Sequence, residues 1–164
     1  MKKMIVAAAI VAAFAVSPLA AQTPPPPPPY GVGIGLEAAK KALAAAEAEA
    51  KKNNWPVAIA IVDSSAKLVA FSKMDNTQHA SVDIAIGKAV TANNLKRPTK
   101  ALQDAIAQGG VNLRILGQPG ITPLEGGVPI IVDGKIVGAI GASGVLSNQD
   151  AEVAMAGAAA AAAK

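Results

Sequence analysis

The 164-residue sequence contains no cysteine, a single histidine (His79) and only 2% aromatic residues. Without cysteine the chain can form no disulfide, no cysteine-linked lipid anchor and no thiolate zinc site. One histidine is too few for a histidine-rich metal site. So few aromatic side chains offer no stacking platform for nucleic-acid bases. The core must therefore be packed by alanine, valine, isoleucine and leucine.

Strong charge of either sign is also missing. The formal net charge is +4, and it falls further once Lys2 and Lys3 are removed with a predicted export signal. We therefore expect no nucleic-acid partner. Because small side chains bury little area each, at roughly 25 cal/mol per Å², a second subunit would add stability. The composition thus predicts a homo-oligomer.

The N-terminus has the pattern of a cleavable signal peptide over residues 1–21. Lys2 and Lys3 precede an apolar stretch, residues 5–16, and small residues follow at Ala20 and Ala21. The stretch is too short to span a bilayer comfortably, since spanning needs about 20 apolar residues. We expect a periplasmic or secreted protein with no stable membrane insertion after cleavage. A retained N-terminal anchor is the alternative.

Six consecutive prolines, residues 24–29, follow the signal. Such a run adopts an extended polyproline II conformation. It predicts a stiff linker over residues 22–34 and a folded domain over residues 35–164. A ligand for a proline-recognition module is the other reading of this run.

Apolar periodicity and turn residues predict alternating helices and strands in the domain. Predicted helices cover 36–53, 81–94, 99–107 and 147–164, and predicted strands cover 57–62, 68–74, 128–132 and 135–142. Ser81 and Thr99 are predicted N-caps, and Ser147 with Asp150 resembles a capping box. Asp133-Gly134 predicts a tight hairpin turn, whereas residues 112–127 read as a long loop. Two hairpins predict an α+β fold: one central antiparallel sheet flanked by helices.

Several separated segments resemble the HbpS/GlcG-like haem-binding family. They are 75–78, Ser81 with 88–92, 97–99, 121–130, 133–144 and 149–150 with the small-residue helix that follows. The resemblance implies a profilin-like fold that often assembles into oligomers. It also implies one of three settings: secreted haem-binding proteins, proteins encoded near glycolate-oxidation enzymes, or the C-terminal domain of PduO-type corrinoid adenosyltransferases.

The candidate ligand-binding residues are few. His79 is a candidate ligand for haem iron, because imidazole is a common axial ligand, and Lys73 and Met74 are fallback ligands. Cationic side chains are candidates to pair with haem propionates or another small anion; they are Lys73, Lys88, Arg97 and Arg114. Alternatively, each of these is an ordinary surface charge.

Backbone and carboxylate groups complete the candidate set. Gly126, Gly127, Ser143 and Gly144 offer backbone N–H groups for an anion nest, or simply serve turns and close packing. Glu125 is a candidate to orient a ligand, but no carboxylate partner lies at a recognisable spacing. We therefore assign cofactor contacts to His79, Lys88, Arg97, Glu125 and these four residues.

No enzyme template fits the sequence. A GxSxG elbow and a P-loop are both absent, so we assign no catalytic residue. The sequence predicts an exported protein that binds a small molecule, with haem or a related tetrapyrrole as the ligand. The alternative is an accessory protein or enzyme that acts on a small metabolite, such as a glycolate-related acid or a corrinoid.

Overall fold

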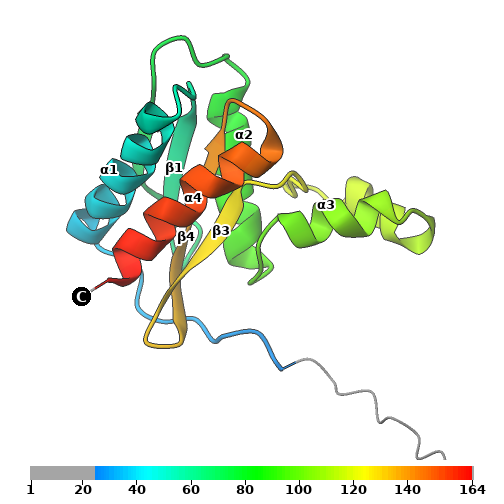
Figure 1. Ribbon diagram of the computed structural model, residues 1–164. Helices are drawn as coiled ribbons and strands as arrows, with labels where there is room; N and C mark the ends of the chain where they lie inside the picture. The colour runs from blue at the N-terminus through cyan, green and yellow to red at the C-terminus, as the bar shows by residue number, and fades with distance from the viewer. Residues whose placement is uncertain (1–24, 164) are drawn as a thin grey trace, which may run out of the picture.

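A computed structural model describes residues 25–163, so the predicted signal peptide at 1–21 lies outside the described residues. The elements follow the predicted order (Figure 1). The helices are α1 (Leu36–Lys52), α2 (Ser81–Asn94), α3 (Lys100–Ala107), the 3₁₀ helix η1 (Gly110–Gly117) and α4 (Ser147–Ala162). The strands are β1 (Ala58–Asp63), β2 (Leu68–Lys73), β3 (Gly127–Val132) and β4 (Lys135–Ser143).

The four strands form one sheet in the order β2-β1-β4-β3. All three strand pairs are antiparallel, so the predicted central antiparallel sheet flanked by helices is confirmed. Asp133 and Gly134 join β3 to β4 with φ angles of 48° and 74°. Both angles are positive, as a type I′ turn requires, and this matches the hairpin that the Asp-Gly pair predicts.

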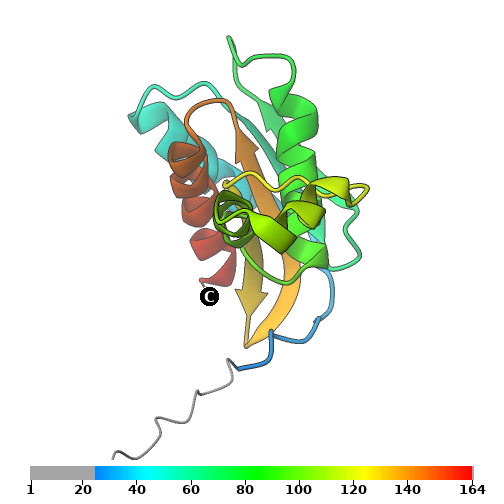
Figure 2. The ribbon, with the colours of Figure 1, turned by 90° about the vertical axis from the view of Figure 1, so that its right-hand side faces the viewer.

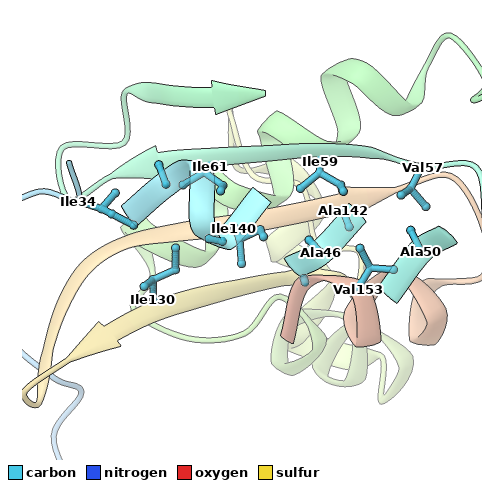
Figure 3. Close-up of a cluster of buried hydrophobic side chains, with 13 residues drawn as sticks. Ile34, Ala46, Ala50, Val57, Ile59, Ile61, Ile130, Ile140, Ala142 and Val153 are labelled. Atoms are coloured by element: carbon cyan, nitrogen blue, oxygen red, sulfur yellow. The ribbon is translucent and has the colours of Figure 1, made fainter. Parts of the chain in front are cut away.

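The sheet separates two hydrophobic cores. Helices α1 and α4 cover one face and α2 covers the other, as the view in Figure 2 shows. Under α1 and α4, branched side chains such as Ile59, Ile61 and Ile140 meet alanines of the helices (Figure 3). Under α2 the core is thinner and built from alanines of β1, β4 and α2 around Val62. The small residues let the helices lie close to the sheet.

Two glycines set how close the helices come. A Cβ atom at Gly141 of β4 would overlap the carbonyl oxygen of Ala85 in α2. A Cβ atom at Gly157 of α4 would meet Ile140 and the Ala42 backbone of α1. The close packing of each helix layer therefore requires a glycine: Gly141 for α2, and Gly157 for α4 against α1 and the sheet.

The end of the predicted linker is part of the domain. Pro29 accepts a hydrogen bond from the Ile136 amide at 2.9 Å, and the Gly31 amide donates to the Ile136 carbonyl at 2.8 Å. Ile34 is buried in the core under α1. Residues 29–34 thus run along the start of β4. The pairing of β1 with β4 ends at Asp63 and Gly138, and Tyr30 continues it by pairing with Ile136.

Three local predictions need correction. The N-cap of α2 is Ala80, and the Ser81 hydroxyl instead accepts a hydrogen bond from Ser143. Thr99 precedes α3, but its hydroxyl bonds Gly127 rather than the helix end. The N-cap of α4 is Leu146, not Ser147, and its amide donates to the Gln149 side chain. For Ser81 and Thr99 a tertiary contact takes the place of the local cap, whereas at α4 the capping interaction is local and lies one residue earlier than predicted.

The predicted loop at 112–127 is partly helical. Its first residues belong to η1, which with α3 forms an arm that projects from the body (Figure 1). Gly109, with φ 71°, separates the two helices as the glycine pair predicts. Within residues 25–163, no helix is long and apolar enough to cross a lipid bilayer.

Replacing Gly141 with alanine tests the close approach of α2. The Gly141→Ala variant should lose about 3 kcal/mol of unfolding free energy, because the new methyl group overlaps backbone atoms that cannot move independently. Urea denaturation measures the change. Gly117→Ala is the matched control, because nothing lies within 4 Å of a Cβ atom there. Equal stability of the two variants would contradict this packing model.

Candidate functional site

The predicted site residues do not form one site. They fall along α2 and its neighbours: His79 before its first turn, Lys88 in its middle, and Arg97 after its last turn. At 1.5 Å per residue, the 14 residues of α2 separate His79 from Arg97 by about 20 Å. The structure thus divides the predicted residues into a buried polar centre and two accessible ends.

Lys88 lies at the buried centre, and the expectation of a surface charge there is wrong. Its residue is 1% exposed. The Nζ atom donates to the Asp150 carboxylate at 2.7 Å and to the Ala142 carbonyl at 2.9 Å. Asp150 belongs to the first turn of α4, on the other side of the sheet. The ion pair therefore connects α2 on one face of the sheet to α4 on the other, next to the start of β3. The Lys88 ammonium group already donates to two protein acceptors.

The glycine pair makes room for this ion pair. Gly126 has φ 122°, and a Cβ atom there would meet the Lys88 Nζ and the Asp150 side chain. The Gly127 amide donates to the Thr99 hydroxyl at 2.9 Å. A Cβ atom at Gly127 would overlap the Lys88 backbone. These glycines therefore serve close packing, the alternative given above to an anion nest.

Burial dominates the electrostatics of the pair. Desolvation lowers the pKa of Lys88, opposed by its bond to Asp150. Desolvation likewise raises the pKa of Asp150, opposed by Lys88 and by the Val145 amide. Both pKa shifts show that burial disfavours the charged form of each side chain. Each charge is therefore stabilised mainly by the opposite charge of its partner.

Ser143 and Gly144 are also engaged in packing. The Ser143 hydroxyl donates to the buried Ser81 hydroxyl at 3.3 Å. Gly144 lies against the backbone of Pro56 and Val57, where a Cβ atom would not fit. Ser143 thus joins the end of β4 to the start of α2, next to the loop that carries His79, and Gly144 packs on the segment before β1.

Arg97 and Glu125 keep accessible side chains. Arg97 is exposed, and its Nε donates to the Leu95 carbonyl at 3.0 Å. Glu125 is half-buried and within 3.4 Å of the Gln103 amide group. Gln103 in turn accepts a hydrogen bond from the Glu125 backbone amide at 3.0 Å. Glu125 is thus held against α3 through Gln103.

The loop between β2 and α2 is the accessible end that carries His79. The imidazole is exposed. Two residues earlier, Thr77 is 5% exposed and its hydroxyl has no hydrogen-bond partner in the described structure. A surface depression of about 350 Å³ lies where this loop leaves β2; it is lined by Glu47, Lys51, Ser72, Lys73, Met74 and Asp75. The fallback ligands Lys73 and Met74 therefore lie in this depression.

Within the described residues, no cluster of three or more histidine, cysteine, aspartate or glutamate side chains is placed to hold a metal ion. His79 is therefore available as a single ligand rather than as part of a multidentate set. One protein ligand is sufficient for an iron that a macrocycle already holds.

Comparison with known proteins identifies the family. A family model described as haem degrading protein HbpS-like matches residues 34–159. The chain belongs to the HbpS-like family. The match includes all four strands and every helix of the described domain except the last three residues of α4, and it confirms the resemblance drawn from the sequence.

Individual relatives support the HbpS-like assignment. Protein GlcG of Escherichia coli (strain K12) is 42% identical over 94 residues, which cover 57% of this chain and 69% of GlcG. The HbpS crystal structure has 33% identity and a TM-score of 0.72, covering 79% of this chain and 90% of HbpS. PduOC, solved as a complex with haem, has 27% identity and a TM-score of 0.72, covering 79% and 95%.

Sequence reasoning missed three residues that matter in this HbpS-like chain. The sequence pattern predicts only a helix cap for Asp150, because its partner Lys88 lies 62 residues away and only the fold brings the two together. Thr77 was one of several polar loop residues, and its buried, unpartnered hydroxyl has no sequence signal. Lys96 follows α2 with a positive φ of 53°, a conformation that its neighbours in the sequence do not indicate.

The ion pair predicts a non-additive pair of substitutions. Lys88→Met should cost about 3 to 5 kcal/mol of unfolding free energy, because it leaves a buried carboxylate without a cation. The double variant Lys88→Met/Asp150→Leu should cost less than this single variant. Chemical denaturation of the parent protein, Lys88→Met, Asp150→Leu and the double variant measures the coupling energy between the two side chains. Additive losses would show that the two side chains do not depend on each other.

The same single variant should respond to pH. In Lys88→Met the unpaired Asp150 has a folded-state pKa above its unfolded value, so its protonated form favours the folded state. The stability deficit relative to the parent protein should therefore narrow as the pH falls from 7 toward about 4. Denaturation curves at several pH values measure the deficit, and a deficit that widens in acid would contradict the assignment.

Proposed function

We propose that this HbpS-like protein binds haem or a related tetrapyrrole at the loop between β2 and α2. The observation that carries the proposal is the likeness to PduOC, whose structure holds haem on the same fold. The family description, haem degrading protein, is in accord with it. The fold alone does not locate a ligand, so the residues of the loop have to be considered next.

The loop offers one iron ligand and one unsatisfied hydroxyl. His79 is exposed and can present an imidazole nitrogen, which is a common protein ligand of haem iron. The orphaned Thr77 hydroxyl is 5% exposed, and a buried hydroxyl without a partner is costly. A bound ligand that supplies a hydrogen bond would remove this cost. Both features support a ligand at this loop.

The depression beside the loop contains Lys73, a cation that could pair with a propionate group of haem. The Ser72 hydroxyl and Lys51 hold the pKa of Glu47 below its ordinary value, so Glu47 is ionised and pairs with Lys51 at 3.1 Å. Lys73 is exposed and takes part in none of the ion pairs found among the described residues. Lys73 is therefore placed to meet a carboxylate, while Met74 offers an apolar surface.

The residues that would hold haem are thus His79, Thr77, Lys73 and Met74. When bound, haem would supply a redox-active iron whose behaviour depends on the axial ligand and on the polarity around it. The chain's part is to bind and orient it. With the signal peptide that the sequence predicts, we place the protein in the periplasm or outside the cell, in haem uptake, sensing or degradation.

Titration with haemin tests the function and the ligand separately. The parent protein should saturate with a shifted Soret band, and His79→Ala should weaken binding at least tenfold and alter the band. Gln78→Ala is the control, because Gln78 is exposed on the same loop. No saturable change with the parent protein would refute haem binding. An unchanged His79→Ala spectrum would refute only the iron ligand.

The alternative function is that of an accessory protein or enzyme for a small metabolite; its basis is the family resemblance drawn from the sequence, which includes proteins encoded near glycolate-oxidation enzymes. Mass spectrometry of the native protein from its host distinguishes the two. A co-purified organic acid or corrinoid, together with no Soret change, would favour the metabolite. Co-purified haem would favour the first proposal.

We also propose that the protein is a homo-oligomer. Large apolar side chains on η1 are exposed: Val111 by 71%, Leu116 by 63% and Leu113 by 49%. Exposed apolar side chains that gather on one short segment are typical of association surfaces. Sedimentation velocity should show a species heavier than the monomer. A monomer at all accessible concentrations would refute the proposal.

A further inference from the structure

A second surface groove lies at the other end of α2 from His79. It has a volume of about 490 Å³ and is lined by Pro25, Pro26, Pro27, Lys96, Arg97 and Ala101. This volume is within the range of small-molecule sites, roughly 300 to 1,000 Å³. One wall is made of proline rings, and the other comes from the connection between α2 and α3.

The chain that follows the groove-lining prolines is anchored to the domain. Pro29 and Gly31 pair with Ile136 of β4 through two backbone hydrogen bonds. The Tyr30 hydroxyl donates to the Asn93 carbonyl at 2.8 Å, near the end of α2. The end of the polyproline segment is therefore anchored to both the sheet and α2, and the preceding residues Pro25, Pro26 and Pro27 line the groove.

Lys96 occupies a position that ordinarily suits glycine. The Arg97 amide bonds the Ala92 carbonyl at 3.2 Å and the Lys96 amide bonds the Asn93 carbonyl at 3.2 Å. This is a Schellman-type helix end, in which the residue after the C-cap is left-handed. Lys96 has φ 53° there, although glycine adopts this conformation without strain. The strained backbone places its Nζ 4.2 Å from the centroid of the Tyr30 ring.

The two cations of the groove lack carboxylate partners. Neither Lys96 nor Arg97 takes part in an ion pair among residues 25–163, whereas Lys100 on the next helix is paired with Asp104 at 2.8 Å. Arg97 uses its Nε on the Leu95 carbonyl. Its terminal guanidinium nitrogens are left to bind an anion, and a carboxylate fits that fork.

We propose that this groove binds a small organic anion made of a carboxylate attached to a flat, apolar ring system. The carboxylate lies between Lys96 and Arg97, and the ring lies against the prolines. The proposal is independent of haem binding at the β2–α2 loop, because the two places are separated by the length of α2. It gives the polyproline segment a role in binding in addition to that of a linker.

Titration calorimetry with 1-naphthoate tests the groove. The parent protein should bind one equivalent per chain. Lys96→Gly and Arg97→Gln should each weaken binding at least tenfold, while Lys96→Gly keeps or raises the thermal unfolding midpoint, because glycine relieves the backbone strain. Lys100→Gln is the matched control and should bind like the parent protein. Equal affinities for all four proteins, or no binding to the parent, would overturn the proposal.

Two further measurements separate this groove from the haem site. Methyl 1-naphthoate lacks the charge and should bind at least tenfold more weakly than 1-naphthoate; equal binding would overturn the role of the cations. Saturating 1-naphthoate should leave the haemin titration unchanged, and His79→Ala should bind 1-naphthoate like the parent protein. Competition with haemin, together with loss of naphthoate binding in His79→Ala, would overturn the separate site and leave the proposed function standing.

Discussion

The buried pair of Lys88 and Asp150 is the contact on which the arrangement of layers depends. It connects α2 on one face of the sheet to α4 on the other, and it also bonds the end of β4 through Ala142. Two ions without water are favourable only with close geometry and satisfied neighbours. The glycines at 126 and 127 supply the space, and Thr99 anchors their backbone. The pair therefore fixes the start of β3 against two helices at once.

Fixing α2 along its middle leaves its two ends to present different chemistry. The first end carries an exposed imidazole and an orphaned hydroxyl beside a mixed-charge depression. The last end carries two cations facing proline rings and a tyrosine. Binding residues are often found on loops that a rigid scaffold positions. In this HbpS-like domain the scaffold is α2, which the buried Lys88–Asp150 ion pair holds in place.

Small residues make this scaffold possible and also explain its surface. Alanines and glycines bring α1, α2 and α4 close to the sheet, so the fully buried members of both cores are aliphatic, and the aromatic side chains of Trp55 and Phe71 pack only at the margins. The larger apolar side chains of η1 are then left on the projecting arm, where the domain has no further layer to cover them. A core of this kind is compact but leaves apolar surface outside it.

The sequence by itself determined the four α-helices and four strands, though not the 3₁₀ helix η1, because apolar periodicity, the Asp133-Gly134 turn and helix-ending glycines are local signals. It also determined the family, through segments kept in one order. Only the tertiary structure decided what the polar residues do. The local sequence predicts that the side chains of Ser81, Thr99 and Asp150 cap helices. In the structure each forms a hydrogen bond with a residue far away in the sequence. Lys88 looked like a surface charge because its partner is 62 residues away. Contacts of that separation depend on packing, which local patterns do not record.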